Sequence, residues 1–415
     1  MTSIAVMTSE CRICGSKRLQ GVIDFGELAL TGVFIENGLQ VPRAPLHLKQ
    51  CEDCRLVQLG HKYKQDALYG ETYGYESHLN KSMVEHLQMK ARVLEARFLQ
   101  SIERPVVVDI ASNDGTFLSG YLSNKIVKVG IDPLIGVVAN CYPQDALQVA
   151  EFFSATVYKK TGVKPANLVT SLSVIYDLDE PVKFAKQVYE ILEEEGIWHF
   201  EQSYLPLMLE TNSYDTICHE HLLYLSLTDI ERILTLANFQ LVDASINSVN
   251  GGSIAVTAIK SAKKVARSPF VDYLLKQESE TGITDGSRIN SFSVEFLNHS
   301  LAIKLLITKY KNLGFDIIGL GASTKGNVLL QAAGIDSNLV RSIGEVNPRK
   351  FGKQTPGSAI PIVPENELLE QTSAKTIVLV LPWHFRENLL PKLEGYLSQG
   401  GKLLFPLPGI EMVSA

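Results

Sequence analysis

Three ionisable side chains follow one another at His219, Glu220 and His221, directly before an apolar run that includes Leu222 and Leu223. An imidazole titrates near neutral pH and can remove a proton from carbon or oxygen. A neighbouring carboxylate can orient the ring and stabilise its charged form. HEH does not match the HExxH pattern of zinc proteases. The segment therefore predicts a general base, the alternative being histidines that are only satisfied core or surface residues.

Four of the six cysteines form two pairs, Cys11/Cys14 and Cys51/Cys54, each with two residues between the thiols. Two such knuckles close a tetrahedral thiolate site for Zn²⁺, and four thiolates leave no open position for catalysis. We therefore predict a structural zinc site in a reducing compartment. The alternative is two reduced turns without metal, whereas a redox role would need only one CxxC. Cys141 and Cys218 are expected to be small buried hydrophobes.

Residues 106–115 read VVVDIASNDG, a β-branched run followed by a tight turn of small residues. Small residues let backbone N–H groups approach a ligand, and Asp109 at the end of the run can meet a cationic group. Asp132 ends the next apolar run, where an acid can accept both hydroxyls of an adenosine ribose. Because the glycines needed beside a pyrophosphate are missing, S-adenosylmethionine fits better than NAD. The alternative is that Asp109 caps a helix and Asp132 starts a turn before Pro133.

The elements that must position these residues alternate between apolar strands and helical stretches. Strands are expected at 105–110, 128–131, 168–171 and 197–201, with helices at 78–100, 116–124 and 182–192, which is typical of a doubly wound parallel sheet. A long helical region covers 265–312. A second α/β unit follows, with strands at 315–319, 376–381 and 403–405 and a helix from Gly326. Residues 1–75 are expected to form a small module stapled by its metal.

The length, composition and net charge limit the classes of protein to which this chain can belong. The chain has 415 residues, too many for one hydrophobic core, and its 45% hydrophobic and 20% charged residues are those of a globular protein. A net charge of -6 argues against a nucleic-acid partner. No apolar run reaches bilayer length, and Met1 to Glu10 lacks the pattern of an export signal, so we expect no membrane partner and a cytoplasmic enzyme.

Taken together, these residues resemble the nucleotide-sugar C-methyltransferases that make branched deoxy sugars, such as those of the tetronitrose and mycarose pathways. The resemblance covers essentially the whole chain. In this order, and with the cysteine pairs, its motifs are highly specific. They are CRICGS, FGELALTGVF, PLHLKQCEDCRLVQL, DIASNDGTFL, EFF at 151–153, CHEHLLYLS, NGGSIAV, GLGASTKGN, NPRKFGKQTPGSAIPI and LPWHF.

The resemblance implies a zinc module at 1–75, a methyltransferase domain at 76–262 with a Rossmann-like sheet that binds S-adenosylmethionine, and a C-terminal α/β domain at 263–415 that holds a nucleotide sugar. It implies His221 as the base, Glu220 as its acid/base partner, and Tyr75 as a sugar-facing phenol. Cofactor contacts would come from Asp109, Ser112, Asn113, Gly115, Asp132 and Phe152. Substrate contacts would come from Tyr73, Cys218, Lys325, Trp383 and His384.

The implied reaction begins with a 4-keto-6-deoxy hexose on a nucleoside diphosphate, dTDP being favoured over GDP. The base removes the proton beside the ketone, and the enolate carbon takes the methyl group, with Tyr75 or His219 as donors to the oxyanion. C3 is the favoured position over C5, and a monomer is expected by family analogy. An RNA or protein methyltransferase, a nicotinamide-dependent reductase and a non-catalytic sugar-nucleotide binding protein are the alternatives.

Three departures from the family pattern bear on the substrate. Cys218 stands where many members have a tyrosine two residues before the glutamate. Ile254 stands where an arginine often follows GGS, and residues 174–181 read VIYDLDEP where relatives often carry a histidine. These changes concern the stereochemistry and the methylated position of the sugar, and they leave the reaction class intact.

Overall fold

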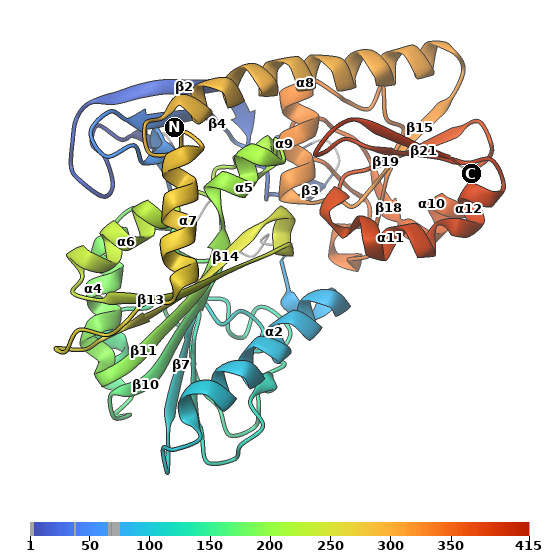
Figure 1. The fold of residues 1–415 in the computed structure, drawn as a ribbon. Coiled ribbons are helices and arrows are strands. Elements are labelled where there is room, and N and C mark those ends of the chain that lie inside the picture. The colour runs from blue at the N-terminus through green and yellow to red at the C-terminus, as the bar shows by residue number, and fades with distance from the viewer. Residues whose placement is uncertain (1–3, 37–38, 65–67, 69–74, 415) are drawn as a thin grey trace.

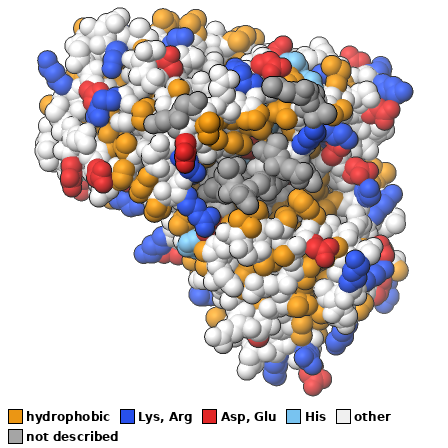
Figure 2. Space-filling view, turned by 180° about the vertical axis from the view of Figure 1, so that it is seen from behind, with side chains coloured by type: hydrophobic (Ala, Val, Ile, Leu, Met, Phe, Trp, Pro, Cys, Tyr) orange, Lys and Arg blue, Asp and Glu red, His pale blue; other side chains and the backbone are white. Residues whose placement is uncertain are grey.

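The computed structural model describes residues 4–36, 39–64, 68 and 75–414. Figure 1 shows a small N-terminal β module and a C-terminal α/β unit side by side, with a central α/β unit below them and the long helix α8 (Ser287–Asn312) running across the first two. From behind, the surface is hollowed where the upper and lower parts meet, and hydrophobic side chains gather along this border (Figure 2).

The N-terminal module is built on a four-stranded sheet of order β12-β5-β4-β2. Along β4, Ala44, Leu46 and Leu48 are buried and alternate with more exposed side chains, as expected for a sheet with one face in the core. The outermost strand, β12, comes from far along the chain and directly follows the His-Glu-His segment. The strands of this module and its pairings are β1 (Ala5–Met7) with β6 (His61–Tyr63), β2 (Leu19–Ala29), β4 (Arg43–Cys51), β5 (Val57–Leu59), β12 (Leu223–Tyr224), and β3 (Ile35–Glu36) with β17 (Lys353–Gln354).

The central sheet has seven strands in the order β13-β14-β11-β10-β7-β8-β9. The five strands from β11 to β9 are parallel, as predicted, and β14 and β13 add an antiparallel edge. Helices α2 and α4 lie on opposite sides of this sheet (Figure 1). Val107 belongs to the buried cluster that contains α2, whereas Val106 and Val108 belong to the cluster that contains α4. The strands are β7 (Val106–Ile110), β8 (Val127–Ile131), β9 (Leu147–Val149), β10 (Ala166–Leu172), β11 (Leu192–Ser203), β13 (Gln240–Asn247) and β14 (Ser253–Ile259).

The helix predicted at 116–124 is wrong. Only a single 3₁₀ turn, η3 (Leu118–Gly120), forms there. The amides of Leu122 and Ser123 donate to the Glu95 carboxylate at 2.7 and 3.0 Å instead of to helical carbonyls. Gly120 also lies so close to α2 that a side chain would have no room. These hydrogen bonds to the Glu95 carboxylate thus take the place of the helical hydrogen bonds that local propensity favours.

The C-terminal unit carries a six-stranded sheet of order β18-β16-β15-β19-β20-β21, parallel except for β21. In chain order its first five strands stand 3-2-1-4-5, and the five parallel strands of the central sheet stand in the same order. Both sheets are therefore Rossmann-like, each with a switch point between its first and fourth strands. The strands are β15 (Asp316–Leu320), β16 (Ile343–Glu345), β18 (Ile362–Pro364), β19 (Thr376–Val380), β20 (Lys402–Phe405) and β21 (Glu411–Ser414).

The remaining helices connect and cover the sheets. The region predicted as helical at 265–312 forms two helices, α7 and α8, broken at Gly286 in a left-handed conformation. Within the described ranges, none of the helices has both the length and the apolar character that crossing a membrane requires. The helices are α2 (Lys81–Leu94), α3 (Ala155–Lys160), α4 (Pro181–Ile191), α5 (Leu205–Glu210), α6 (Leu227–Leu236), α7 (Pro269–Glu280), α9 (Thr324–Ala333), α10 (Glu365–Glu370), α11 (Arg386–Lys392) and α12 (Glu394–Ser398).

Candidate active site and zinc centre

The four paired cysteines converge on one point. Their sulfur atoms all lie within 4.8 Å of one another, with Sγ–Sγ distances of 3.4 Å for Cys11–Cys54 and 3.7 Å for Cys14–Cys51. A tetrahedral Zn²⁺ with bonds of about 2.3 Å needs sulfurs about 3.8 Å apart. A hydrogen bond from Cys54 lowers the pKa of Cys11 to about 5. The four thiols therefore fit a closed structural zinc site.

Both knuckles are tied to the central unit. Arg12, inside the first knuckle, is buried and its Nε donates to Asp179 at 3.0 Å, beyond the end of β10. Its other nitrogens donate to the carbonyls of Leu59 and His61. In the second knuckle, the carbonyl of Cys54 accepts from Arg232 of α6 at 3.1 Å. The metal site thus fixes the module against the central sheet and not only within itself.

His221 is held by the short 3₁₀ turn η5 (Tyr214–Thr216). Its Nδ1 lies 2.8 Å from the carbonyl oxygen of Thr216, and its ring packs on Tyr176 with centroids 4.3 Å apart. A carbonyl only accepts hydrogen bonds, so Nδ1 carries the proton and Nε2 keeps a free lone pair. Burial lowers the pKa of His221 to about 4, so the ring is neutral at pH 7.

His221 lies at the carboxyl edge of the central sheet. It lines a small cavity together with Tyr176, which follows β10, and Ser203, which ends β11. β10 also pairs with β7, whose carboxyl end leads into the turn at 111–115. The imidazole and the predicted cofactor turn therefore lie at the same edge of the sheet.

The other residues of the segment point elsewhere. His219 is fully buried on the module's sheet, where Nε2 donates to the carbonyl of Ala44 at 3.2 Å and its ring packs on Tyr63. Cys218 is fully buried. Glu220 faces a cavity of about 170 Å³ that is also lined by Lys62 and Tyr63. Its Oε2 has no hydrogen-bond partner among the described residues, and burial raises its pKa.

The sequence expectation that Glu220 orients the imidazole is therefore corrected. The group that holds Nδ1 of His221 is the Thr216 carbonyl. Within this tight turn the side chains of Glu220 and His221 line different cavities. Sequence reasoning had no signal for a backbone acceptor five residues upstream.

The turn at 111–115 is shaped for close approach of a ligand. Asn113 and Gly115 have positive φ angles of 48° and 86°. Asp132 accepts from the amides of Asn113 at 2.9 Å and Leu134 at 2.7 Å. A carboxylate has about four acceptor sites, so it retains capacity for two hydroxyls. Asp109 accepts from Thr170 at 2.6 Å, and burial raises its pKa to about 7.

Tyr142 is a residue that sequence reasoning missed. Its hydroxyl lies 2.7 Å from Ser112 Oγ and donates to the Asn113 carbonyl at 3.0 Å. Its ring fills the space beside Gly115 and Gly130, where side chains would collide with it. The two glycines were the available signal, because a small residue in the turn and another on the adjacent strand β8 leave room for a large group to pack against both. Tyr142 thus packs against the small residues of the turn and helps to hold its shape.

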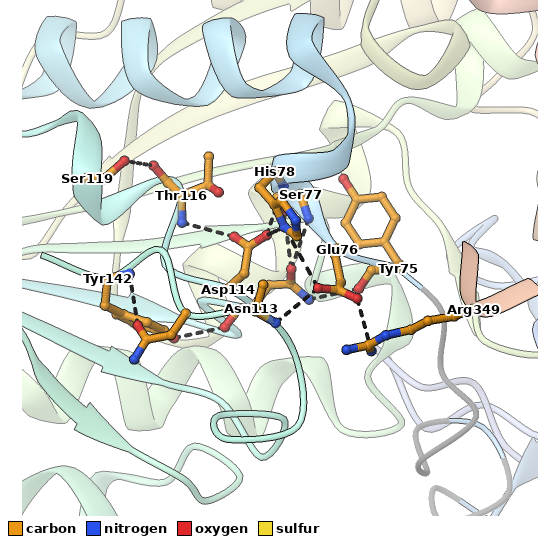
Figure 3. Close-up of polar contacts among 12 residues, drawn as sticks. Tyr75, Glu76, Ser77, His78, Asn113, Asp114, Thr116, Ser119, Tyr142 and Arg349 are labelled. Carbon is orange, nitrogen blue, oxygen red and sulfur yellow. Dashed lines mark hydrogen bonds and ion pairs between the residues drawn. The ribbon is translucent and has the colours of Figure 1, made fainter. Parts of the chain in front are cut away.

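A segment at 75–78 crosses this turn (Figure 3). Asn113 accepts from the Ser77 amide at 3.1 Å and donates to the Tyr75 carbonyl at 3.3 Å, and Asp114 accepts from the amide and ring of His78. Tyr75 is 48% exposed as a residue, and burial raises the pKa of its phenol. Tyr73 lies outside the described residues. Phe152, predicted at the cofactor, has a largely exposed ring on the loop after β9.

The C-terminal residues singled out from the sequence gather at the switch point of the second sheet. Lys325 follows β15 at the start of α9, while Trp383 and His384 follow β19. The Lys325 ammonium donates to the carbonyl of Asn250 in the turn between β13 and β14. Trp383 Nε1 donates to Asp215 Oδ2 at 2.8 Å. The crevice of the second sheet thus closes against η5, the turn that holds His221.

Comparisons with known proteins agree with this three-part layout. Family models match a zinc binding domain at residues 11–69, a methyltransferase domain at 83–244 and a C-methyltransferase C-terminal domain at 248–408. Over 420 residues the chain is 26% identical to the C-methyltransferase NovU of Streptomyces niveus, covering 100% of this chain and 99% of that protein.

Solved structures match over part of the chain. One is the 1,6-didemethyltoxoflavin-N1-methyltransferase of Burkholderia thailandensis with bound S-adenosylhomocysteine, at 14% identity, TM-score 0.31, 42% of this chain and 78% of that one. Another is the N-methyltransferase NodS of Bradyrhizobium japonicum, at 13% identity, TM-score 0.32, 44% of this chain and 98% of that one.

Proposed function

Because the chain belongs to the S-adenosylmethionine-dependent C-methyltransferases with an N-terminal zinc-binding domain and a C-methyltransferase C-terminal domain, we propose that its substrate is a nucleotide-linked 4-keto-6-deoxy sugar. The order of motifs from CRICGS to LPWHF supports this substrate class. dTDP is the proposed nucleotide, and C3 is the proposed position of methylation. We also propose that the zinc module ends at residue 75 and that the C-terminal domain begins at residue 263.

The observation that supports this proposal is the neutral imidazole of His221, whose Nδ1 donates to the Thr216 carbonyl and whose Nε2 carries the lone pair at the carboxyl edge of the central sheet. A ketone acidifies the neighbouring C–H. Nε2 takes that proton, and the electron pair left on carbon is delocalised into the carbonyl as an enolate. When bound, S-adenosylmethionine supplies an electrophilic methyl group on sulfur, which the enolate carbon can accept.

Tyr75 is proposed to stabilise the developing oxyanion, because it is half-exposed and lies beside the cofactor turn. Glu220 is buried and lines a different cavity from His221, so it is not proposed as a donor to this oxygen. The Nε2–H of His219 donates a hydrogen bond to the Ala44 carbonyl, so we propose that His219 positions the segment and does not contact the substrate. Donors placed in advance at an oxyanion supply a large share of the rate.

We propose that the cofactor is held by Asp109, Ser112, Asn113, Gly115 and Asp132, with Phe152 at its border. Asp132 would accept from the ribose hydroxyls, and the Asp109 carboxylate would attract the cationic end of the ligand. Holding the two reactants at a short separation turns a bimolecular step into one within the site.

We expect S-adenosylmethionine affinity to fall roughly tenfold between pH 7 and pH 5.5. Burial raises the pKa of Asp109 to about 7, so acid protonates the carboxylate that attracts the cation. Titration calorimetry at a series of pH values measures this. In the control variant Asp109→Asn the affinity should be lower and should depend less on pH over this range, the remaining dependence coming from Asp132, whose pKa is also raised by burial. A wild-type affinity that stays constant from pH 7 to 5.5 would contradict the role of Asp109.

The proposed function is tested by incubating the protein with S-adenosylmethionine and the dTDP- and GDP-linked 4-keto-6-deoxy hexoses. A mass gain of one methylene on the sugar is the expected result. Without the cofactor, the carbon beside the ketone should exchange its hydrogen for solvent deuterium. If a sugar shows neither binding, methylation nor exchange, and this holds for every sugar, the proposed substrate class is overturned. If a sugar binds but shows neither methylation nor exchange, the protein has kept the fold and lost the chemistry.

A further inference from the structure

His78, Asp114 and Cys141 bring three metal-ligating side chains together outside the zinc centre. An imidazole nitrogen, a carboxylate oxygen and a thiol sulfur all lie within 4.8 Å of one another. Nδ1 of His78 is 3.0 Å from Oδ2 of Asp114 (Figure 3). Zn²⁺ bonds such atoms at about 2.0–2.3 Å, so a tetrahedral ion holds them about 3.3–3.6 Å apart. The observed separations bracket this range, and the group therefore has nearly the size that one ion needs.

The three side chains come from separate segments around the cofactor turn. His78 belongs to the 3₁₀ turn η1 (Ser77–Leu79) before α2, Asp114 to the turn at 111–115, and Cys141 to the loop between β8 and β9. The Cys141 amide donates to the Asp114 carbonyl at 2.7 Å. The His78 amide donates to the Asp114 carboxylate at 2.8 Å. Backbone contacts therefore hold the three side chains at one place.

The negative charge at this place is incompletely balanced. Asp114 is fully buried, and no lysine or arginine in the described ranges pairs with its carboxylate. Glu76 is buried beside it, with Oε2 3.8 Å from Nδ1 of His78. Arg349 balances Glu76 through its other oxygen at 3.0 Å. A buried carboxylate without a cation is costly, so the group favours an added positive charge.

The hydroxyl of Thr116 is a second, independent observation. Thr116 is 3% exposed, and its Oγ1 has no hydrogen-bond partner among the residues that the structure describes. Its side chain is adjacent to the Cys141 thiol. A buried hydroxyl without a partner is uncommon and indicates a group that binds beside it. Three protein ligands leave the fourth position of an ion to water, and that water can bond to Thr116.

We propose that His78, Asp114 and Cys141 bind a divalent cation of the Zn²⁺ type, which ties the segment at 75–78 to the cofactor turn. Thiolate and imidazole ligands favour Zn²⁺ and similar ions over Mg²⁺ and Ca²⁺. Binding releases the thiol proton to solvent, and the imidazole proton moves from Nδ1 to Nε2, so that Nδ1 can bond to the ion. His78 and Cys141 are both partly exposed, although the sequence predicted a buried Cys141, so an ion can enter from solution.

The bound ion is expected to slow the exchange of the cofactor, a consequence that rests on the proposed cofactor contacts at the turn. Asn113 already accepts from the Ser77 amide and donates to the Tyr75 carbonyl. Bonds from one ion to His78 and Asp114 join the same two segments. The ion therefore stabilises the arrangement in which the segment at 75–78 crosses the turn.

The site is tested by titrating Co²⁺ into the full chain, dialysed so that only the zinc of the four paired cysteines is retained. Co²⁺ takes the ligands of Zn²⁺ but binds less tightly, so it leaves that zinc in place. We expect one further ion per chain, with the charge-transfer absorption of a cobalt–thiolate bond, and no displacement by excess Mg²⁺. Absence of this absorption, or displacement by Mg²⁺, would overturn the site.

Cys141→Ser should remove the absorption and weaken Co²⁺ binding at least about tenfold, while the zinc of the paired cysteines stays bound. The matched control is Cys218→Ser, because Cys218 is the other thiol outside the knuckles and is fully buried. Its cobalt absorption should equal that of the wild type. If Cys141→Ser does not fold, His78→Gln should weaken Co²⁺ binding to a similar extent. An unchanged cobalt affinity in either ligand variant would show that the ion binds elsewhere.

The effect on the turn is measured by stopped-flow dissociation of S-adenosylmethionine. Saturating Co²⁺ should slow dissociation from the wild type by about fivefold or more, and it should have no effect on Cys141→Ser. Equal dissociation rates for the wild type with and without Co²⁺ would overturn the link between the ion and the cofactor turn.

Discussion

Replacing His221 by asparagine should lower the rate of methyl transfer by about 10²- to 10⁴-fold. The side-chain amide can still donate to the Thr216 carbonyl, as Nδ1 of the imidazole does over 2.8 Å in the wild type. What is lost is the lone pair of Nε2, so the proton beside the ketone has no acceptor. Single-turnover methyl transfer and deuterium exchange at that carbon should both fall by the same factor. Their parallel loss distinguishes a missing base from a misplaced methyl donor, which would leave exchange intact.

His199 provides the control for this experiment. It is another buried histidine of the central sheet, and its Nδ1 bonds to Thr257 on the neighbouring strand. Burial lowers its pKa to about 3, so it too is neutral at pH 7. His199→Asn should change stability and leave both rates within a few-fold of wild type. If His221→Asn exchanges and methylates like the wild type, another group is the base.

The sequence was most informative where one chemical requirement sets a spacing. Two CxxC pairs predicted the zinc site, because thiolates with two residues between them can reach one ion, and the family comparison and the sulfur cluster confirm it. The β-branched run at 106–110 predicted a buried parallel strand, and β7 is such a strand. Local chemistry and local pattern decide both features.

The sequence was least informative where a residue far away in the sequence determines the local structure. The helix expected at 116–124 does not form because the carboxylate of Glu95, 27 and 28 residues upstream, accepts from the amides of Leu122 and Ser123. Residues 223–224 carry no sign that they pair with β5, across more than 160 positions. Asp215 reads as one acid in a polar stretch, and only the fold brings it to Trp383. Long-range pairings of this kind depend on topology, which periodicity does not encode.

The pairing of β12 with β5 connects the zinc module to the proposed base. Leu222 alone separates β12 from His221, and the Leu59 amide donates to the Leu222 carbonyl at 2.9 Å. The strand β5 follows the second knuckle by two residues. The knuckle therefore fixes one end of the sheet that the His-Glu-His segment joins through β12. The metal itself lies apart from the proposed reacting atoms.

Removing the zinc should consequently abolish methyl transfer, with a loss of at least about 100-fold. Structural zinc sites contribute about 10–16 kcal/mol of binding free energy to folding, so the module should not keep its sheet without the metal. Cys51→Ser is the sharpest variant, because Cys51 is fully buried at the end of β4. Metal content, thermal melting and single-turnover rate measure the effect.

The cofactor site separates this effect from general unfolding. The turn at 111–115 is held by Asp132 and Tyr142 within the central sheet, so Cys51→Ser should keep S-adenosylmethionine affinity within a few-fold of wild type. Cys141→Ser makes the same substitution outside the knuckles and should retain zinc and rate. Loss of cofactor binding together with the rate would mean that the whole chain unfolds. Zinc-free Cys51→Ser that methylates at the wild-type rate would show that the base is positioned without the module.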